Sequence, residues 1–252
     1  MLKKKEDMNI ILRRTLPFFI AGFIAGLKKW DLKTSRRPDH YIAISSGVKL
    51  RIKKIYGIDA DVIFPPVDIK KFELVEHTDN FYLIVSRLNS YKKIDLAVKV
   101  FNILGIPLKI IGSGPLLGTL KSLARPNVSF LGRMNDREVA GYYAACKPLI
   151  FPGEEDAGIV PLEANAAGRP VIAFQGGGAL DTIIEGVNGF FFNEITAESL
   201  IKAIQSLEAG QYNFQPQEVR AQALRFDKEI FRSRMENYIF KKYEEFKKSG
   251  GK

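Results

Sequence analysis

The sequence has few of the residues that build disulfide frameworks and metal centres. Among its 252 residues there is one cysteine, Cys146, and there are two histidines, His40 and His77. A single cysteine excludes an internal disulfide, which fits a reducing compartment such as the cytoplasm, and such a thiol is more often packed than reactive. Two histidines far apart and one cysteine form no ligand cluster, so the sequence predicts no metal site.

A hydrophobic run long enough to cross a bilayer, which needs about 20 apolar residues, is also missing. The segment "LPFFIAGFIAGL" (16–27) has only 12 residues and is flanked by Arg13, Arg14, Lys28 and Lys29. Its length and charge suit a signal peptide, but no small-x-small cleavage site follows. Two interpretations stay open: a helix lying on a membrane surface between basic flanks, or a core helix of a domain that is mostly absent from this chain.

Acidic residues are scarce at the N-terminal end alone. The chain has 38 Lys and Arg against 28 Asp and Glu, a net charge of +10. Residues 1–54 hold 14 basic and 4 acidic residues, whereas the rest holds 24 of each sign. The excess charge therefore belongs to the N-terminal segment, which is suited to nucleic acid, anionic lipid or an anionic partner.

The central part of the chain alternates between short apolar runs and helix-like stretches. The apolar runs are "FYLIVSR" (81–87), "LKIIG" (108–112), "VSFLG" (128–132), "PLIFPG" (148–153) and "PVIAFQ" (170–175). The helix-like stretches are 91–104, 115–124, 135–145 and 158–167. Strands buried on both faces lack polar alternation, so the pattern predicts an α/β fold with a doubly wound, Rossmann-like parallel sheet. Ligands of such sheets bind at the carboxyl ends of the strands.

The flanking segments have patterns of their own. Residues 41–58 predict a short strand, a helix cap at Ser45 or Ser46, and a basic amphipathic helix. Pro65 and Pro66 then mark an extended linker. The C-terminal stretch "FDKEIFRSRMENYIFKKYEEFKK" predicts one long amphipathic helix that packs along another element.

Two predicted strand ends carry candidate ligand-binding residues. Arg87 ends one strand and Lys92 lies close to the next helix start, where a guanidinium and an ammonium would suit a diphosphate. The alternative is two solvated surface cations. Gly112 and Gly114 follow another strand, but the third glycine comes one place late for a dinucleotide fingerprint. A tight turn that lets the backbone approach a ligand is the better interpretation.

The segment "EEDAGIVPLEANAAG" (154–168) places two carboxylates, Glu155 and Glu163, on either side of a helix start. With Gly158 opening the helix, the backbone N–H groups as far as Val160 would point at a ligand. A carboxylate accepts hydrogen bonds from a pair of neighbouring hydroxyls, so the arrangement would suit two sugar rings joined by a diphosphate. The structural alternative is that these acids only complement the helix dipole.

Several ordered motifs together resemble the donor domain of glycosyltransferase family 4. They are "AIS", "VIFPPVD", "RLNSYK", "IIGSGP", "VSFLGRMNDREVAGYYAAC", "EEDAGIVPLEANAAGRPVIA" and "GGGALDTIIEGVNGFFF". The two glutamates match the family's E-x7-E signature. The resemblance covers about residues 40–240, and "KKWDLKTSRRPDHYIA" is similar to the close of the family's N-terminal domain.

The resemblance implies the C-terminal half of the two-domain, B-type glycosyltransferase fold. Residues 1–62 would be a remnant of the acceptor domain with a linker, residues 63–226 the nucleotide-sugar-binding domain, and residues 227–252 a C-terminal helix. It implies a retaining transfer of a sugar from a nucleoside-diphosphate sugar to a glycan or lipid-linked acceptor, without metal or other cofactor and without nucleic acid. The residues of these motifs are most similar to those of polysaccharide and lipopolysaccharide mannosyltransferases, which implies GDP-mannose as the donor.

The resemblance also assigns roles to residues. Arg87 and Lys92 would hold the diphosphate and stabilise the leaving group, and Glu155 would contact the transferred sugar. Glu163 would bind the ribose hydroxyls, with Arg133 and Met134 beside the base. The remaining members of the implied donor site are Gly112, Gly114, Asp156, Ala157, Gly158, Ile159 and Val160.

The sequence departs from the family pattern in three respects. Ala157 stands where the family usually has Phe and Asn165 where Met is common, which is expected to loosen the packing around the donor sugar. A complete acceptor domain would need about 150–180 further residues. Either the chain is truncated, or a separate polypeptide supplies the other half; a membrane surface is a possible partner of the N-terminal segment.

Three functions therefore stay open at the level of sequence. The first is a glycosyltransferase that turns over once its N-terminal half is complete. The second is a nucleotide-sugar-binding module without turnover of its own. A hydrolysing sugar-nucleotide epimerase is a weaker third alternative, because the E-x7-E signature fits it less well.

Overall fold

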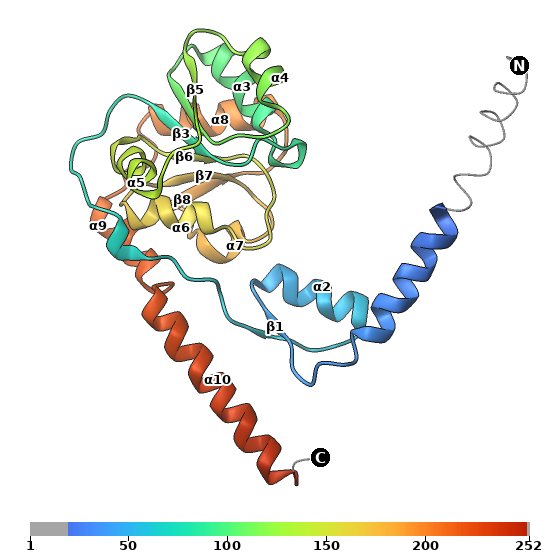
Figure 1. Ribbon diagram of the computed structural model, residues 1–252. Helices are drawn as coiled ribbons and strands as arrows, with labels where there is room; N and C mark the ends of the chain where they lie inside the picture. Colours follow the sequence, from blue (N-terminus) through green and yellow to red (C-terminus); the bar gives the residue numbers. More distant parts are fainter. Residues whose placement is uncertain (1–19, 251–252) are drawn as a thin grey trace, which may run out of the picture.

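The computed structural model describes residues 20–250 and is built around a six-stranded parallel sheet (Figure 1). The strands are β3 (Tyr82–Val85), β4 (Leu108–Ile111), β5 (Val128–Gly132), β6 (Leu149–Phe151), β7 (Val171–Phe174) and β8 (Gly189–Phe192). Their order in the sheet is β5-β4-β3-β6-β7-β8. The predicted α/β, doubly wound, Rossmann-like sheet is thus confirmed. The prediction from apolar runs did not include β8, because its short "GFFF" run follows the turn residues "GVN".

Both faces of this sheet are covered by helices, as a parallel sheet requires. Side chains of β3 alternate between the two faces, so Tyr82 and Ile84 join one core cluster and Leu83 the other. The first face is covered by α3 (Ile94–Leu104), α4 (Leu117–Leu123) and α8 (Ala197–Glu208). The second face is covered by α5 (Asp136–Ala145), α6 (Ile159–Ala166), α7 (Ala179–Thr182) and α9 (Pro216–Leu224).

The chain reverses direction across the sheet between β3 and β6, and this switch point fixes where a ligand can lie. From β3 the next strands, β4 and β5, are added towards one edge of the sheet. From β6 the next strands, β7 and β8, are added towards the other edge. The loops that leave the carboxyl ends of β3 and β6 therefore diverge and leave a crevice between them. The sequence motifs at 87–92, 112–114, 133–134 and 154–163 follow the carboxyl ends of β3, β4, β5 and β6 respectively.

Residues 20–62 form an arm that projects from the sheet domain (Figure 1). A helix over residues 20–34 leads into β1 (Ile42–Ala43), α2 (Ser46–Tyr56) and β2 (Asp61–Val62), and β1 pairs with β2 in parallel. The Ser45 side chain accepts a hydrogen bond from the Val48 N–H at 3.1 Å, which confirms the predicted cap.

The apolar run predicted at residues 16–27 lies only partly within the described residues. Its described part is helical, and the side chains of Ile20, Phe23, Ile24 and Leu27 are exposed. Within residues 20–250, no helix combines the length and the apolar character needed to cross a membrane.

Helix α10 (Lys228–Lys248) extends from the sheet domain towards the arm (Figure 1). An ion pair of 2.9 Å between Lys228 and Asp68 fixes its first turn. Further along, burial and the neighbouring Asp61 of β2 raise the pKa of Tyr238. None of the residues of α10 is fully buried, and the expectation that this helix packs along another element stays a prediction.

Candidate functional site

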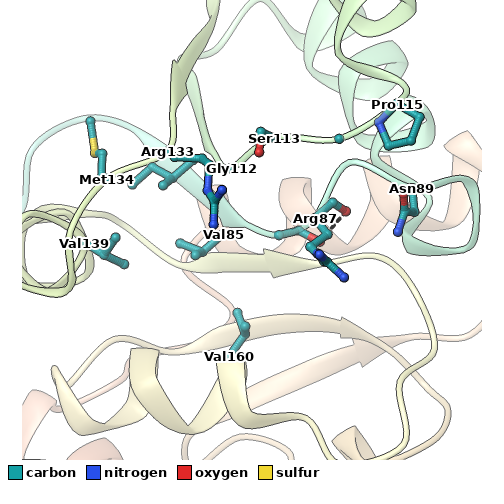
Figure 2. A pocket seen from close by; sticks show the side chains of 13 residues that line it. Val85, Arg87, Asn89, Gly112, Ser113, Pro115, Arg133, Met134, Val139 and Val160 are labelled. Carbon is teal, nitrogen blue, oxygen red and sulfur yellow. Dashed lines mark hydrogen bonds between the residues drawn. The ribbon is translucent and has the colours of Figure 1, made fainter.

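A cavity of about 590 Å³ lies at the switch point of the sheet (Figure 2). Most of its lining comes from the loops that follow β3, β4 and β5, and α6 supplies Val160 on the opposite side. The lining residues are Val85, Ser86, Arg87, Asn89, Ile111, Gly112, Ser113, Gly114, Pro115, Arg133, Met134, Val139 and Val160. Its volume falls in the range of small-molecule sites.

Six of the residues predicted from the sequence thus line the cavity: Arg87, Gly112, Gly114, Arg133, Met134 and Val160. Arg87 and Arg133 bring two guanidinium groups to the side formed by the strand ends. The apolar side chains of Met134 and Val139 line one end, which would suit a flat ring. The sequence analysis assigned no role to Asn89, Ser113 or Val139, although all three lie within motifs that carry the family resemblance.

Gly112 and Gly114 are required by the approach of two loops. A Cβ atom on Gly112 would lie 1.9 Å from the Ser86 carbonyl oxygen, and one on Gly114 would lie 2.7 Å from the Leu88 nitrogen. Gly112 also has a φ of 131°, which side chains rarely allow. The glycines therefore let the β4 loop pack on the β3 loop, while their backbone lines the cavity.

Lys92 and Glu155 contact each other beside this cavity. Lys92 lies in the 3₁₀ turn η2 (Ser90–Lys92), and its ammonium forms an ion pair with the Glu155 carboxylate. Their side chains are only 12% and 22% exposed. Gly153 makes the contact possible, because a Cβ there would lie 2.8 Å from the Lys92 Cα. The sequence assigned the two charges to different parts of a ligand, whereas the structure pairs them with each other.

A second glycine-rich turn, which contains Gly177 and Gly178, packs against the loop from Glu154 to Gly158. The Gly178 N–H donates to the Glu155 carbonyl at 2.7 Å. A Cβ on Gly177 would lie 2.2 Å from the same oxygen, and one on Gly178 would lie 2.5 Å from the Ala157 carbonyl carbon. Gly158 has a φ of 65° and precedes α6, as the sequence predicted.

Glu163 lies inside α6, about one turn beyond its start, and faces a second cavity of about 460 Å³. Val85 and Val139 line both cavities, so the two spaces adjoin. The Tyr143 hydroxyl of α5 donates to Glu163 Oε2 at 2.8 Å. Burial raises the pKa of Glu163, and the Tyr143 hydrogen bond opposes that shift. Tyr143 was not predicted, because its partner lies on another helix.

The raised pKa makes a contribution to stability that depends on pH. Below the ordinary value of 4.5 the Glu163 carboxyl is protonated whether the chain is folded or not. As pH rises, the unfolded chain ionises first, so wild-type stability falls until the folded carboxyl ionises too. We expect Glu163→Gln to gain stability relative to wild type as pH rises above 4.5. Urea unfolding across this range measures the difference, with the exposed Glu236→Gln as a control; a difference that does not change with pH would contradict it.

Asp156 faces the arm. Arg51 of α2 binds it with two nitrogen atoms, at 2.7 and 3.4 Å. Ile159 is 40% exposed and lines the second cavity, while Val160 lines the first. The roles assigned to Asp156, Ala157 and Ile159 in donor binding stay predictions.

The expectation that Asn165 loosens the packing around a donor sugar is wrong. Its side chain is fully buried and donates to the carbonyl oxygens of Arg169 and Asn188, both at 2.9 Å. Asn188, also fully buried, donates back to Asn165 Oδ1 at 2.9 Å. The polar side chain is therefore matched by a partner that the sequence did not reveal.

Across residues 20–250, no three His, Cys, Asp or Glu side chains are placed to hold a metal ion together. The chemistry of this site lies in two guanidinium groups, an ammonium, two carboxylates and the free N–H groups at the start of α6. Such a set can bind an anion and hydroxyl groups at the same time.

Comparison with known families agrees with this geometry. Residues 67–224, more than half of the chain, match the family described as glycosyl transferases group 1. The chain belongs to this family. The family match spans the six-stranded sheet and every residue predicted from the sequence to bind the donor, from Arg87 to Glu163.

Two relatives illustrate the range of the similarity. An uncharacterised glycosyltransferase of Methanocaldococcus jannaschii is 28% identical over 174 residues, covering 67% of this chain and 49% of the relative. A GDP-mannose-dependent alpha-mannosyltransferase of Corynebacterium glutamicum is 32% identical over 120 residues, covering 47% of this chain and 29% of the relative. The chain thus spans at most about half the length of these relatives.

A solved structure confirms the fold beyond the family match. The lipopolysaccharide outer core galactosyltransferase WaaB, in its apo form, superposes with a TM-score of 0.71 at 23% identity. The superposition covers 81% of this chain and 62% of the galactosyltransferase. The predicted half of a B-type glycosyltransferase fold is confirmed.

Proposed function

We propose that this chain is the donor-binding part of a retaining glycosyltransferase. It takes a hexose from a nucleoside-diphosphate sugar and passes it to a glycan or lipid-linked acceptor. One observation carries the proposal: Arg87 and Arg133 face the N-terminal turn of α6 across a cavity of about 590 Å³ at the switch point of the sheet.

The proposed placement of the donor follows the charges. The diphosphate lies between Arg87 and the free N–H groups of Ile159 and Val160, within reach of Lys92. The ribose hydroxyls bind the Glu163 carboxylate, and the base lies against Met134. The transferred sugar meets Glu155, which then shares Lys92 with the diphosphate. Arg87 and Lys92 stabilise the charge that develops on the leaving diphosphate.

GDP-mannose is the donor that we propose first. The support is the Corynebacterium relative, which is described as GDP-mannose-dependent. The WaaB structure is that of a galactosyltransferase, so its similarity supports the fold and not the sugar. Thermal shifts with a panel of nucleotide-sugars test the choice, and a larger shift with another donor than with GDP-mannose would replace it.

Arg87→Ala and Lys92→Ala are each expected to weaken nucleoside-diphosphate binding by about 1.5–3 kcal/mol, the usual value of a hydrogen bond to a charged group. The reason is that each removes a cation placed for the diphosphate. Titration calorimetry with GDP and with UDP measures the loss. Lys99→Ala, which removes an exposed lysine of α3, is the matched control. Wild-type affinity in both site variants would overturn the diphosphate assignment and the function built on it.

A second candidate function is nucleotide-sugar binding without turnover by this chain alone. The chain spans about half of a relative's length, and the arm contributes only two strands to a sheet of its own. Transfer assays with and without a candidate partner chain distinguish the two functions. Transfer by this chain alone would exclude the second.

We also propose that the arm docks on an apolar surface, either an acceptor half-domain or a membrane. Phe23 and Trp30 are 69% and 61% exposed on its first helix, and basic residues flank the apolar run. Apolar burial and attraction to anionic lipid would act together there. We expect the full chain to sediment with anionic liposomes and a chain starting at Asp39 to stay in the supernatant. If both stay in the supernatant as monomers, neither docking partner is needed.

A further inference from the structure

The arm touches the sheet domain close to the candidate donor site. Arg51 of α2 binds Asp156 through two nitrogen atoms, the shorter contact being 2.7 Å. At the N-terminus of the same helix, the Ser46 N–H donates to Asp181 Oδ2 at 2.9 Å. Helix α2 is therefore held at two points, and Figure 1 shows it beside α7, which carries Asp181.

Both contact points are connected to Glu155 through the backbone. Asp156 is the next residue along the chain. Asp181 belongs to α7, which begins directly after Gly178, and the Gly178 N–H donates to the Glu155 carbonyl at 2.7 Å. Because backbone segments joined in this way move together, a shift of α2 would carry the Glu155 loop with it.

Stability alone does not account for the Arg51 contact. The two side chains are 53% and 52% exposed, and ion pairs this exposed contribute little to folding. The contact can instead fix the position of the loop that contains Asp156. The residue before Asp156 is Glu155, which carries the candidate sugar-binding carboxylate.

We propose that Arg51 is a positioning residue: by holding Asp156, it sets where the Glu155 carboxylate stands and so couples the arm to recognition of the donor sugar. This inference rests on the proposed function of the site. Arg51 lies outside residues 67–224, so the family match assigns it no role. A cavity of about 360 Å³ between α2 and the loop, lined by Ser46, Leu50, Arg51, Glu154 and Asp156, leaves the loop room to move when the contact is lost.

The test compares affinity for a nucleoside diphosphate with affinity for the same diphosphate carrying its sugar. The probes are GDP with GDP-mannose and UDP with UDP-glucose, titrated by calorimetry. The variants are Arg51→Asp, Asp156→Arg and the double exchange, which restores the pair in reverse. Lys53→Asp is the matched control, because it makes the same charge change on α2 at an exposed pair with Asp59.

The sugar-dependent gain in affinity is expected to fall about three- to tenfold in each single variant and to recover in the double exchange. In Arg51→Asp, affinity for the diphosphate alone and the melting temperature are expected to stay at wild-type values, as is every value for Lys53→Asp. An unchanged gain in the single variants, or a double exchange no better than they are, overturns the inference. If wild type binds neither diphosphate, the proposed function fails, and the inference fails with it.

Discussion

Replacing Asn188 with alanine is expected to lower the free energy of unfolding by about 3–5 kcal/mol, because several buried hydrogen bonds are lost at once. Its amide donates to Asn165 Oδ1 and to the Thr182 carbonyl, both at 2.9 Å, and accepts from the Ile184 N–H at 2.6 Å. Alanine would leave these buried groups without partners and would open a small cavity beside them.

Urea unfolding followed by circular dichroism measures this loss. Asn213→Ala is the matched control, since it removes the same amide from an exposed loop position. A loss for Asn188→Ala no larger than for the control would show that water or a shifted backbone replaces the network. Asn165→Ala is expected to behave like Asn188→Ala, because each residue binds the other.

Gly177→Ala is expected to abolish recognition of the donor sugar while the sheet domain stays folded. The φ of this residue is 57°, and an added Cβ would lie 2.2 Å from the Glu155 carbonyl oxygen. The left-handed conformation costs alanine about 1–2 kcal/mol, and the overlap forces the Glu155 loop to move. We expect affinity for the sugar-bearing donor to fall by more than about tenfold, or 1.4 kcal/mol.

A second glycine separates backbone strain from the contact with Glu155. Gly186 has a φ of 78°, and an added Cβ would have no atom within 4 Å. Gly186→Ala therefore adds similar strain without moving the loop. Calorimetry with the donor and urea unfolding are measured on both variants. Equal donor affinity in the two would mean that the Glu155 loop tolerates the displacement and that its shape does not matter for binding.

The sequence predicted the fold well because β-strands buried on both faces show an unmistakable pattern. The run "PLIFPG" is apolar at every position and "LKIIG" at every position but Lys109, as is typical of the centre of a covered parallel sheet. Strand β8 escaped because its run is short and begins at a glycine. Pairing of β1 with β2 also escaped, since two-residue strands carry almost no pattern of their own.

The candidate site was predictable only as far as local motifs reach. Arg87, Gly112 and Arg133 follow strands directly, so their meeting at one edge follows from a parallel sheet. Contacts across the fold leave no local signal. Tyr143 meets Glu163 from another helix, and Arg51 meets Asp156 across 105 positions. From the sequence alone Asn165 was expected to loosen the packing, whereas in the fold Asn188 donates a hydrogen bond to it.

The ion pair between Lys92 and Glu155 has a consequence for which anions this site admits. The carboxylate is attached to the same chain, so it competes for Lys92 at an effective concentration in about the millimolar range or above. A free monovalent or divalent anion such as inorganic phosphate must exceed that concentration to displace it. A diphosphate bound to Arg87, as we propose, would be tethered as well and would compete with the carboxylate on equal terms. Lys92 thus has a counterion within its own chain, and Glu155 would act as a filter against small anions in the surrounding solvent.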